Sequence, residues 1–437
     1  MTKVCVLGGG LSGLTFAFYY RNSEVLEKEK IAGGLARSIY DSDYTFDLGS
    51  HIVFSKDKKV LDFMLSLLKN NKIKHRRNTK ILYHGRYVKY PFENGLVDLP
   101  KKEIFECIID YLKVYLKREK SELPPSRNFY EWMINYFGKS ITEKYLYPYN
   151  KKVWSTAPEK MATFWVEGRV PQPPIEDVLK AAIGLNSEGY LHQLFFYYPK
   201  RDGYQAIPNE LSNKLSERLK KSCEVKKIRK EKNFIIETNN KDIYEYKKLV
   251  STIPIHNLVN IYDYVPSEIK KAVKKLRFNS LYLVMIGVKK PKINNLHWLY
   301  IPDEEILPNR ISFPSNYSPF VVPKGHSSIL AEITYHQSDK IAREKPDKLK
   351  EKTIEQLSSL NILKTTDVSF SRIIRVEHAY VVYDLEYEEN IKKVYEFANE
   401  EGIHLLGRFS EFKYYNADAC IRRGMELAKA FNLQAKH

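Results

Sequence analysis

Short apolar runs alternate with amphipathic stretches along the chain, and the first run is the most informative. Lys3 to Leu7 is apolar and contains β-branched residues, which is typical of a buried parallel strand. Leu14 to Phe18 then favours a helix, and Glu24 to Leu26 favours a second strand. This order of strand, helix and strand predicts an α/β unit built on a parallel sheet.

The rest of the chain alternates between blocks of strands and blocks of helices. Further strands are predicted at 44–48, 80–83, 86–90, 224–227, 234–238, 249–253, 281–288, 311–313, 329–334 and 405–408. Helices are predicted at 58–70, 104–117, 129–137, 175–183, 204–220 and 417–431. The helices between 101 and 195 have no strand among them, so they are interpreted as a helical insertion.

A glycine-rich turn joins the first strand to the first helix and fits the pattern G-x-G-x-x-G. Gly8 permits the tight turn, Gly10 lets the backbone approach a pyrophosphate, and Gly13 lets the helix pack closely on the strand. Leu11 and Ser12 lie at the helix N-terminus, where free N–H groups and the helix dipole favour phosphate. The turn therefore predicts a dinucleotide site.

The residues after the second strand indicate which dinucleotide binds. Glu27 ends that strand about 20 residues after the first glycine, where a carboxylate can accept hydrogen bonds from a ribose. Gly34, Leu35 and Arg37 follow within the segment 31–37. A second close backbone approach with a cation suits the pyrophosphate of FAD better than NAD.

A second strand–glycine–helix arrangement lies near the other end of the chain. Gly407 and Arg408 follow a predicted strand, and Asn416 and Asp418 open the last predicted helix. Backbone N–H groups at such a helix start can meet the ribityl or pyrimidine end of a flavin. We therefore expect a nucleotide domain that is interrupted and then resumed.

Composition limits the remaining possibilities. A chain of 437 residues with 43% hydrophobic and 28% charged residues is expected to form two or three globular domains. It contains no run of 18 apolar residues, which predicts no membrane span, and the early first strand leaves no room for a signal peptide. The four cysteines are scattered without a C-x-x-C pair, so reduced thiols, a cytoplasmic location and no metal site are expected.

The formal net charge of +18 raises the question of nucleic-acid binding. The lysines are spread along polar faces, and no nucleic-acid motif is present. A positive field that attracts small anionic molecules is the better interpretation.

Several motifs together resemble one family of flavoenzymes. The matching segments are 47–55, 90–94, 149–154, 165–170, 309–319, 377–380 and 407–414. On these segments the chain is similar to the UDP-galactopyranose mutases, especially their eukaryotic-type branch. That family lies within the superfamily of amine oxidases and protoporphyrinogen oxidases.

The resemblance implies a role for each matching residue. Gly49, Ser50 and His51 would position the flavin, and His51, Arg169 and Arg310 would be the catalytic residues. The two arginines would also clamp a diphosphate, which suits bidentate guanidinium groups. The other implied substrate contacts are Tyr90, Phe92, Glu93, Asn150, Trp154, Tyr317, Tyr380 and Tyr414.

Three departures from the family pattern accompany the resemblance. Glu93 and Ala417 stand where the family has glutamine, and an ionised Glu93 accepts hydrogen bonds but cannot donate them. The segment 196–207 is more similar to that of the oxidase-type relatives than to the glycine-rich segment of the mutases.

The implied enzyme is an FAD-dependent isomerase that interconverts UDP-galactopyranose and UDP-galactofuranose for cell-surface glycans. Its reduced FAD would attack the sugar through flavin N5, and NAD(P)H would supply the electrons. A homo-oligomer is possible. One alternative is an FAD-dependent oxidoreductase of the amine oxidase or protoporphyrinogen oxidase type, and another is a flavin- or sugar-nucleotide-binding protein without catalysis.

The predicted fold class is α/β, with a split Rossmann-type FAD-binding domain, a helical insertion and a mixed-sheet substrate domain. The FAD-binding domain is expected at 1–60, 196–278 and 396–437. The substrate-domain sheet is expected at 61–100 and 279–395, and the insertion at 101–195.

Overall fold

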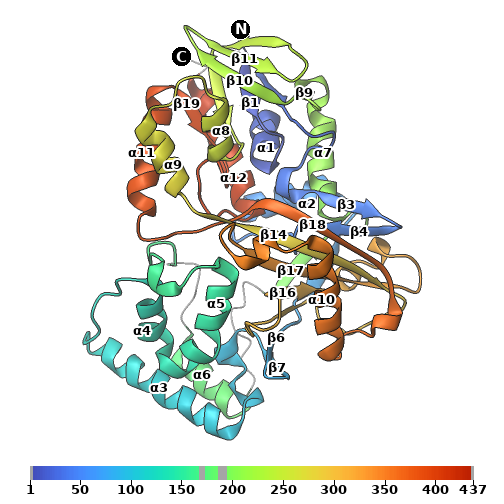
Figure 1. Ribbon diagram of the computed structural model, residues 1–437, viewed down its shortest axis with the longest axis vertical. Coiled ribbons are helices and arrows are strands. Elements are labelled where there is room, and N and C mark those ends of the chain that lie inside the picture. Colours follow the sequence, from blue (N-terminus) through green and yellow to red (C-terminus); the bar gives the residue numbers. More distant parts are fainter. Residues whose placement is uncertain (1–2, 167–172, 186–193, 435–437) are drawn as a thin grey trace.

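The computed structural model describes residues 3–166, 173–185 and 194–434. A nucleotide-binding region lies at the top of Figure 1, a long sheet crosses its middle, and a group of helices lies at the lower left. The predicted fold class is confirmed.

The nucleotide-binding region is built on a fully parallel sheet of five strands. Its order is β19 (Ile403–Leu405), β13 (Lys248–Ser251), β1 (Val4–Leu7), β2 (Ser23–Leu26) and β9 (Leu219–Lys220). Strand β1 is central, and the five strands come from three separate stretches of the sequence, 4–26, 219–251 and 403–405. The expectation that the nucleotide domain is interrupted and resumed is therefore confirmed at the level of the sheet.

The two faces of this sheet follow the alternation of β1. Val4 and Val6 pack with α1 (Leu11–Tyr19), α2 (Lys58–Leu68), α7 (Ala206–Leu215) and α12 (Ala417–Gln434). Cys5 and Leu7 face the other side. That side is covered by α8 (Ile255–Ile261), α9 (Ser267–Lys275), α11 (Tyr387–Glu400) and the antiparallel strands β10 (Val225–Lys230), β11 (Phe234–Thr238) and β12 (Ile243–Tyr246). Burial on both faces explains why β1 is apolar throughout.

The second large sheet has seven strands and is mixed. Its order is β18 (Val368–Val381), β14 (Phe278–Val288), β17 (Ser327–Tyr335), β16 (Arg310–Ser312), β15 (Trp298–Tyr300), β6 (Thr79–Tyr83) and β7 (Arg86–Lys89). Only the pair of β15 and β6 is parallel. Tyr300, Arg310, Glu332 and Tyr380 lie on strands of this sheet.

Strand β14 is buried on both faces. Val284 and Ile286 point toward a core shared with α10 (Pro346–Ser359), whereas Leu283 and Met285 face the short hairpin of β3 (Ser38–Asp41) and β4 (Tyr44–Asp47). Strands β5 (Ile73–Arg76) and β8 (Phe195–Tyr198) form a separate short antiparallel sheet.

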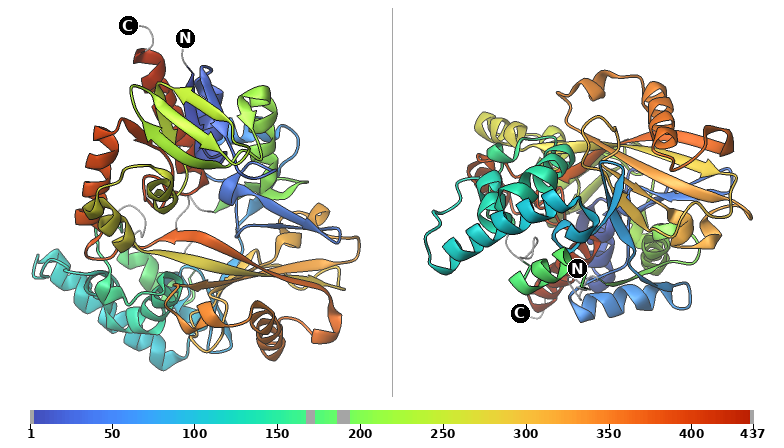
Figure 2. Two further views of the ribbon diagram at one scale, coloured as in Figure 1. Left: turned by 45° about the horizontal axis from the view of Figure 1, so that its top comes forward. Right: turned by 90° about the horizontal axis from the view of Figure 1, so that it is seen from below.

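The helical insertion contains α3 (Lys101–Glu119), α4 (Phe129–Ile141), α5 (Tyr147–Trp154) and α6 (Ile175–Ala182). Their apolar faces share one core with β6, β7 and the turn at Phe92. Both views of Figure 2 keep these helices at one end of the long sheet. Within the three described ranges, no helix is long and apolar enough to cross a membrane.

Several predicted elements differ in extent, and others were missed. The helix predicted at 204–220 ends at Leu215, because Leu219 and Lys220 pair with β2 as the edge strand β9. The strand predicted at 405–408 ends at Leu405, before the glycine turn. The elements without a predicted counterpart are helices α5, α8, α9, α10 and α11 and strands β3, β5, β8, β12, β15 and β18.

Candidate functional site

The glycine turn has the geometry that its sequence predicts. Gly8 has a φ of +94°, and a Cβ on Gly13 would lie 2.2 Å from the carbonyl oxygen of Gly8. A Cβ on Gly10 would meet no protein atom within 4 Å, so the space beside it is open. Leu11 and Ser12 begin α1, whose N-terminus points its N–H groups at this space. The turn therefore leaves room for a ligand beside Gly10, in addition to reversing the chain direction.

The second glycine pair packs against the first turn. The Gly33 amide donates to the Gly9 carbonyl over 2.8 Å, and a Cβ on Gly34 would lie 3.2 Å from the Gly10 Cα. Glu27 is buried and accepts a bond from the Gly9 amide at 2.6 Å. Leu35 is half-buried, and Arg37 donates from Nε to the Gly34 carbonyl. Sequence segments 8–13 and 27–37 thus form one site.

The C-terminal glycine turn meets the same place. A Cβ on Gly407 would lie 2.5 Å from Ser12 Oγ, and the Gly407 amide donates to Glu411 over 2.7 Å. At the start of α12, Asn416 is exposed, while Asp418 accepts a bond from Ser55 Oγ at 2.8 Å. The turn and the helix start therefore lie against the first glycine turn and the His51 segment.

The loop before His51 follows β4 and is held by a buried carboxylate. Asp47 accepts bonds from Ser38 Oγ, Tyr198 Oη and the Tyr204 amide at 2.6, 2.7 and 2.9 Å. Burial raises the pKa of Asp47 to about 6. A Cβ on Gly203 would lie 2.6 Å from Asp47 Oδ1. The segment 196–207, which departs from the mutase pattern, therefore anchors this loop.

His51 has an unpaired nitrogen in the interior of the site. Its ring lies against Tyr204 with centroids 4.9 Å apart, and its Nδ1 is buried without a hydrogen-bond partner. Burial lowers the pKa of His51 to about 4, so the ring is neutral at neutral pH. A neutral imidazole offers one donor and one acceptor to a ligand. Gly49, with a φ of +125°, and Ser50 lead the chain into this position.

These features fit FAD. The open space at Gly10, the free N-terminus of α1 and the acid at Glu27 suit its pyrophosphate and ribose. The unpaired nitrogens of His51 and Arg408 suit the polar edge of a flavin. The chain would hold FAD across all three glycine turns.

Buried histidines also predict how stability depends on pH. Burial lowers the pKa of His51, His297 and His378 to about 4 each, against about 6.5 in an unfolded chain. At these three histidines the unfolded state therefore binds more protons between about pH 4 and 6.5, so they make stability increase as the pH rises through that window. Asp47, whose pKa burial raises to about 6, acts in the opposite direction. We expect the free energy of unfolding to rise by up to about 1.4 kcal/mol per pH unit for each histidine.

Urea titrations at several pH values can test this prediction. The ring of His378 stacks on Phe278 with centroids 4.3 Å apart. His378→Phe should keep that contact and reduce the slope of stability against pH. An unchanged slope in the variant would contradict the assignment.

A buried ion pair joins the His51 loop to the substrate sheet. Arg310 on β16 donates from Nε and Nη2 to the two carboxylate oxygens of Glu332 on β17, at 3.0 and 2.7 Å. Glu332 also accepts from the Ser50 amide at 3.0 Å and from Ser50 Oγ at 2.7 Å. Burial alone would raise the pKa of Glu332, but Arg310 and Ser50 lower it below its usual value. The carboxylate thus binds the flavin-side loop and the arginine together.

Glu332 was missed by the sequence analysis, although its position carried a signal. It is a single charged residue in the apolar strand Ser327–Tyr335, and its side chain is fully buried. A buried charge requires a partner. The sequence therefore indicated that Glu332 needs a partner, but it did not identify Arg310 as that partner.

One wall of the site is aromatic. The Trp154 ring lies 5.4 Å from the Tyr414 ring and 6.0 Å from the Tyr380 ring, measured between centroids. The Arg408 guanidinium lies 4.3 Å from the Tyr414 centroid. Asn150 accepts from Trp154 Nε1 at 3.1 Å and so fixes the indole. These predicted residues converge, although they come from three separate segments.

The site has a second aromatic wall, formed around Tyr300. The Tyr300 ring lies 4.9 Å from Tyr90 and 5.2 Å from Tyr149, and Arg77 lies 4.6 Å from the Tyr90 centroid. Burial is the main cause that raises the pKa of Tyr149, and the charge of Arg310 opposes it. Tyr300, Tyr149 and Arg77 were not predicted, because no local pattern marks them among the 32 tyrosines and 71 lysines and arginines of the chain.

The residues after Tyr90 turn into the insertion. Phe92 was expected to contact the substrate, but the side chain is fully buried and stacks on Tyr145 with centroids 5.1 Å apart. Glu93 is also buried in this turn. The structure therefore leaves Tyr90 half-buried at the wall and places Phe92 in the core.

The remaining predicted residues divide between the site and undescribed positions. Tyr317 is buried with an unpaired hydroxyl, and the charges of Arg310 and Glu332 both act on it. Arg169 lies outside the described residues, so its predicted role stays a prediction. The other predicted residues, apart from Phe92, Glu93 and Asn416, lie on the glycine turns, the His51 loop, the Arg310–Glu332 pair or the aromatic walls.

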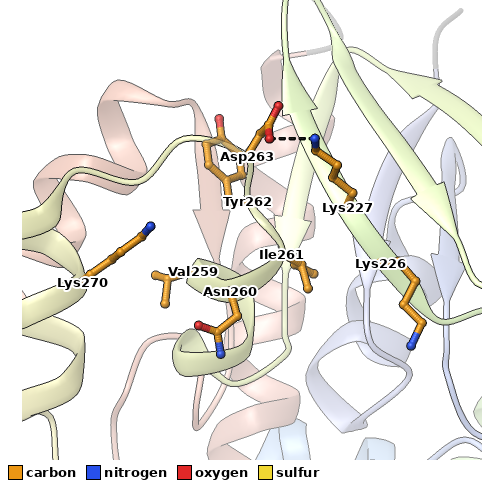
Figure 3. A pocket seen from close by; sticks show the side chains of 8 residues that line it. All are labelled: Lys226, Lys227, Val259, Asn260, Ile261, Tyr262, Asp263 and Lys270. Carbon is orange, nitrogen blue, oxygen red and sulfur yellow. Dashed lines mark ion pairs between the residues drawn. The ribbon is translucent and has the colours of Figure 1, made fainter.

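A separate hollow of about 400 Å³ lies beside β10 and α8. Figure 3 shows Lys226, Lys227 and Lys270 around it, with Lys227 paired to Asp263 at 2.8 Å. Lys226 and Lys270 are exposed, and none of the site residues lines the hollow. Its lysines contribute to the positive surface.

Residues 13–402 match the family model described as flavin-containing amine oxidoreductase. The chain belongs to this family. FAD follows as the cofactor, in agreement with the three glycine turns. The assignment holds for the family and does not by itself fix a substrate.

Solved structures support the same fold. A crystal structure of reduced UDP-galactopyranose mutase has a TM-score of 0.91 and 27% identity, and the match covers 100% of this chain and 95% of that chain. A putative protoporphyrinogen oxidase from Exiguobacterium sp. 255-15 has a TM-score of 0.76 and 14% identity, with 99% of each chain covered. A fatty acid isomerase from P. acnes has a TM-score of 0.68 and 13% identity, with 98% of each chain covered. These last two show likeness of fold alone.

Proposed function

We propose that this flavoenzyme interconverts UDP-galactopyranose and UDP-galactofuranose. The observation that carries the proposal is the Ser50–Glu332–Arg310 network, which sets an arginine beside the flavin-side loop and among hydroxyl-bearing rings. An arginine in this position suits an anionic diphosphate better than a cationic amine. The likeness to the reduced mutase structure supports the same choice.

Different side chains of the site would hold the diphosphate and the uridine. Arg310, Tyr317, Tyr380 and Tyr414 would hold the diphosphate, because a guanidinium and neutral hydroxyls can all donate to its oxygens. Burial raises the pKa of Tyr380 and of Tyr317, so both hydroxyls keep their protons. Trp154 and Tyr90 would offer flat rings to the uridine, and Asn150 would orient Trp154. Arg169 would be the second clamp.

The glycine turns and the His51 loop would hold FAD, and its reduced form would supply a nucleophile for the anomeric carbon of the sugar. His51 would contact the flavin with a neutral ring, and its loop is fixed through Ser50. The aromatic walls exclude water from the exposed sugar carbon. NAD(P)H would be the source of electrons.

The redox state of the enzyme provides the test. Protein reduced with dithionite under anaerobic conditions should convert UDP-galactofuranose to the pyranose, and oxidised protein should not. Chromatography of the two UDP-sugars measures the conversion. Oxygen consumption with release of peroxide from an amine or a porphyrinogen, without any UDP-sugar conversion, would instead establish the oxidoreductase alternative.

A further inference from the structure

A lysine of the helical insertion is held by the substrate sheet. Lys152 lies on α5, and its Nζ donates to the carbonyl oxygens of Ile301, Asp303 and Pro308 at 3.0, 2.6 and 2.8 Å. An ammonium group has three donors and no acceptor, so these three carbonyls satisfy it completely. The side chain is an internal cross-link between two parts of the molecule.

The three carbonyls belong to the loop that connects β15 to β16. Tyr300 ends β15 and Arg310 begins β16, so both residues lie at the base of this loop. The base is closed by a bond from the Ile301 amide to the Asn309 carbonyl at 3.0 Å. Because Lys152 binds both arms of the loop, it fixes where Arg310 and Tyr300 begin.

The other end of the cross-link is equally well fixed. Asn279 on β14 is fully buried and donates from Nδ2 to the Trp154 carbonyl at the end of α5. Helix α5 also carries Asn150 and Trp154, which form part of the first aromatic wall. One short helix therefore links Trp154, which would face the uridine, to the loop that carries the diphosphate clamp Arg310.

We propose that Lys152 is a positioning residue that sets the spacing between Trp154 and Arg310. This inference rests on the proposed function and adds a determinant of substrate recognition to it. A ligand that reaches both residues, such as UDP, depends on that spacing. A ligand that reaches Trp154 but not Arg310, such as uridine, does not.

The neighbouring residue provides a matched control. Lys151 binds Glu304 of the same loop at 2.9 Å, but both side chains are about half exposed. Exposed ion pairs contribute little to structure. Lys151→Met therefore removes the same charge from the same helix without removing the internal cross-link.

Isothermal titration calorimetry with UDP and with uridine tests the inference. We expect Lys152→Met to weaken UDP binding roughly tenfold or more and to leave uridine binding and the flavin spectrum unchanged. Lys151→Met should bind both ligands as the wild type does. A general loosening of the fold would weaken both ligands alike, which separates it from a positioning role.

Three outcomes overturn the inference. Equal UDP affinity in Lys152→Met and the wild type would show that the spacing does not depend on this lysine. An equal loss for UDP and uridine would show a structural role only. A wild type that binds no UDP would overturn the proposed function as well, and so is distinguishable from the other two.

A second variant covers the case in which Lys152→Met does not fold. Lys152→Arg keeps the charge and several donors, but its larger planar head cannot occupy the same position among the three carbonyls. We expect UDP binding to weaken and uridine binding to be unchanged here too. Wild-type UDP affinity in Lys152→Arg would then count against the inference.

Discussion

Replacing Gly10 with valine is expected to abolish FAD binding and to leave the apoprotein folded. Gly10 has a φ of −75°, which any residue can adopt, and no protein atom lies within 4 Å of its would-be Cβ. The new side chain would therefore occupy space that belongs to the pyrophosphate and not to the protein. We expect a loss of affinity of at least about a hundredfold, or about 2.7 kcal/mol.

Gly13 provides the contrast within the same motif. Its Cβ would lie 2.2 Å from the Gly8 carbonyl, so Gly13→Ala should disturb the packing of α1 on β1 and lower the melting temperature. Flavin absorbance after reconstitution and circular dichroism of the apoproteins separate the two effects. Stoichiometric flavin in Gly10→Val would show that the open space serves another purpose.

The sequence predicted the nucleotide-binding region well because its constraints are local. A turn that needs glycine at Gly8 and Gly13 leaves a readable pattern, and β1 is apolar because both of its faces are buried. The strand, glycine turn and helix around Gly407 also form a local pattern, so the return of the chain to the nucleotide-binding region was predictable. Its contact with Ser12 joins segments almost 400 positions apart, which only the resemblance to a split domain could suggest.

Other elements were hidden because tertiary contacts determine them. Strand β18 alternates irregularly between polar and apolar residues, since much of it is only partly buried. Its long antiparallel pairing with β14 supplies the order that its own pattern does not indicate. Leu219 and Lys220 continue a helical pattern, yet their backbone completes the edge of the parallel sheet.

The walls of the site were predictable residue by residue only through resemblance. Tyr90, Trp154, Tyr380 and Tyr414 have no local pattern that separates them from the other tyrosines and tryptophans. Phe92 shows the limit of this approach, because a flat ring in the right motif lies in the core instead. Residue type gives the chemistry, but the packing of the insertion decides which ring is accessible.

Removing Arg310 is expected to have two separable effects, on stability and on ligand binding. Arg310→Ala would leave Glu332 as a buried carboxylate with only the Ser50 donors, and breaking such a buried pair reduces stability by about 3–5 kcal/mol. Because Ser50 precedes His51, we also expect the flavin spectrum to change. Loss of charge-assisted bonds to the diphosphate should weaken UDP binding roughly ten- to a hundredfold.

The double variant Arg310→Met with Glu332→Leu separates these effects. Replacing both charges by apolar groups of similar size leaves no unpaired charge, so stability should return to within about 2 kcal/mol of the wild type. UDP binding should stay weak, because the clamp is still missing. Urea unfolding and competition against a fluorescent UDP probe measure the two quantities. If the double variant regained UDP affinity together with stability, Arg310 would serve the fold alone, and the diphosphate would have to be held elsewhere.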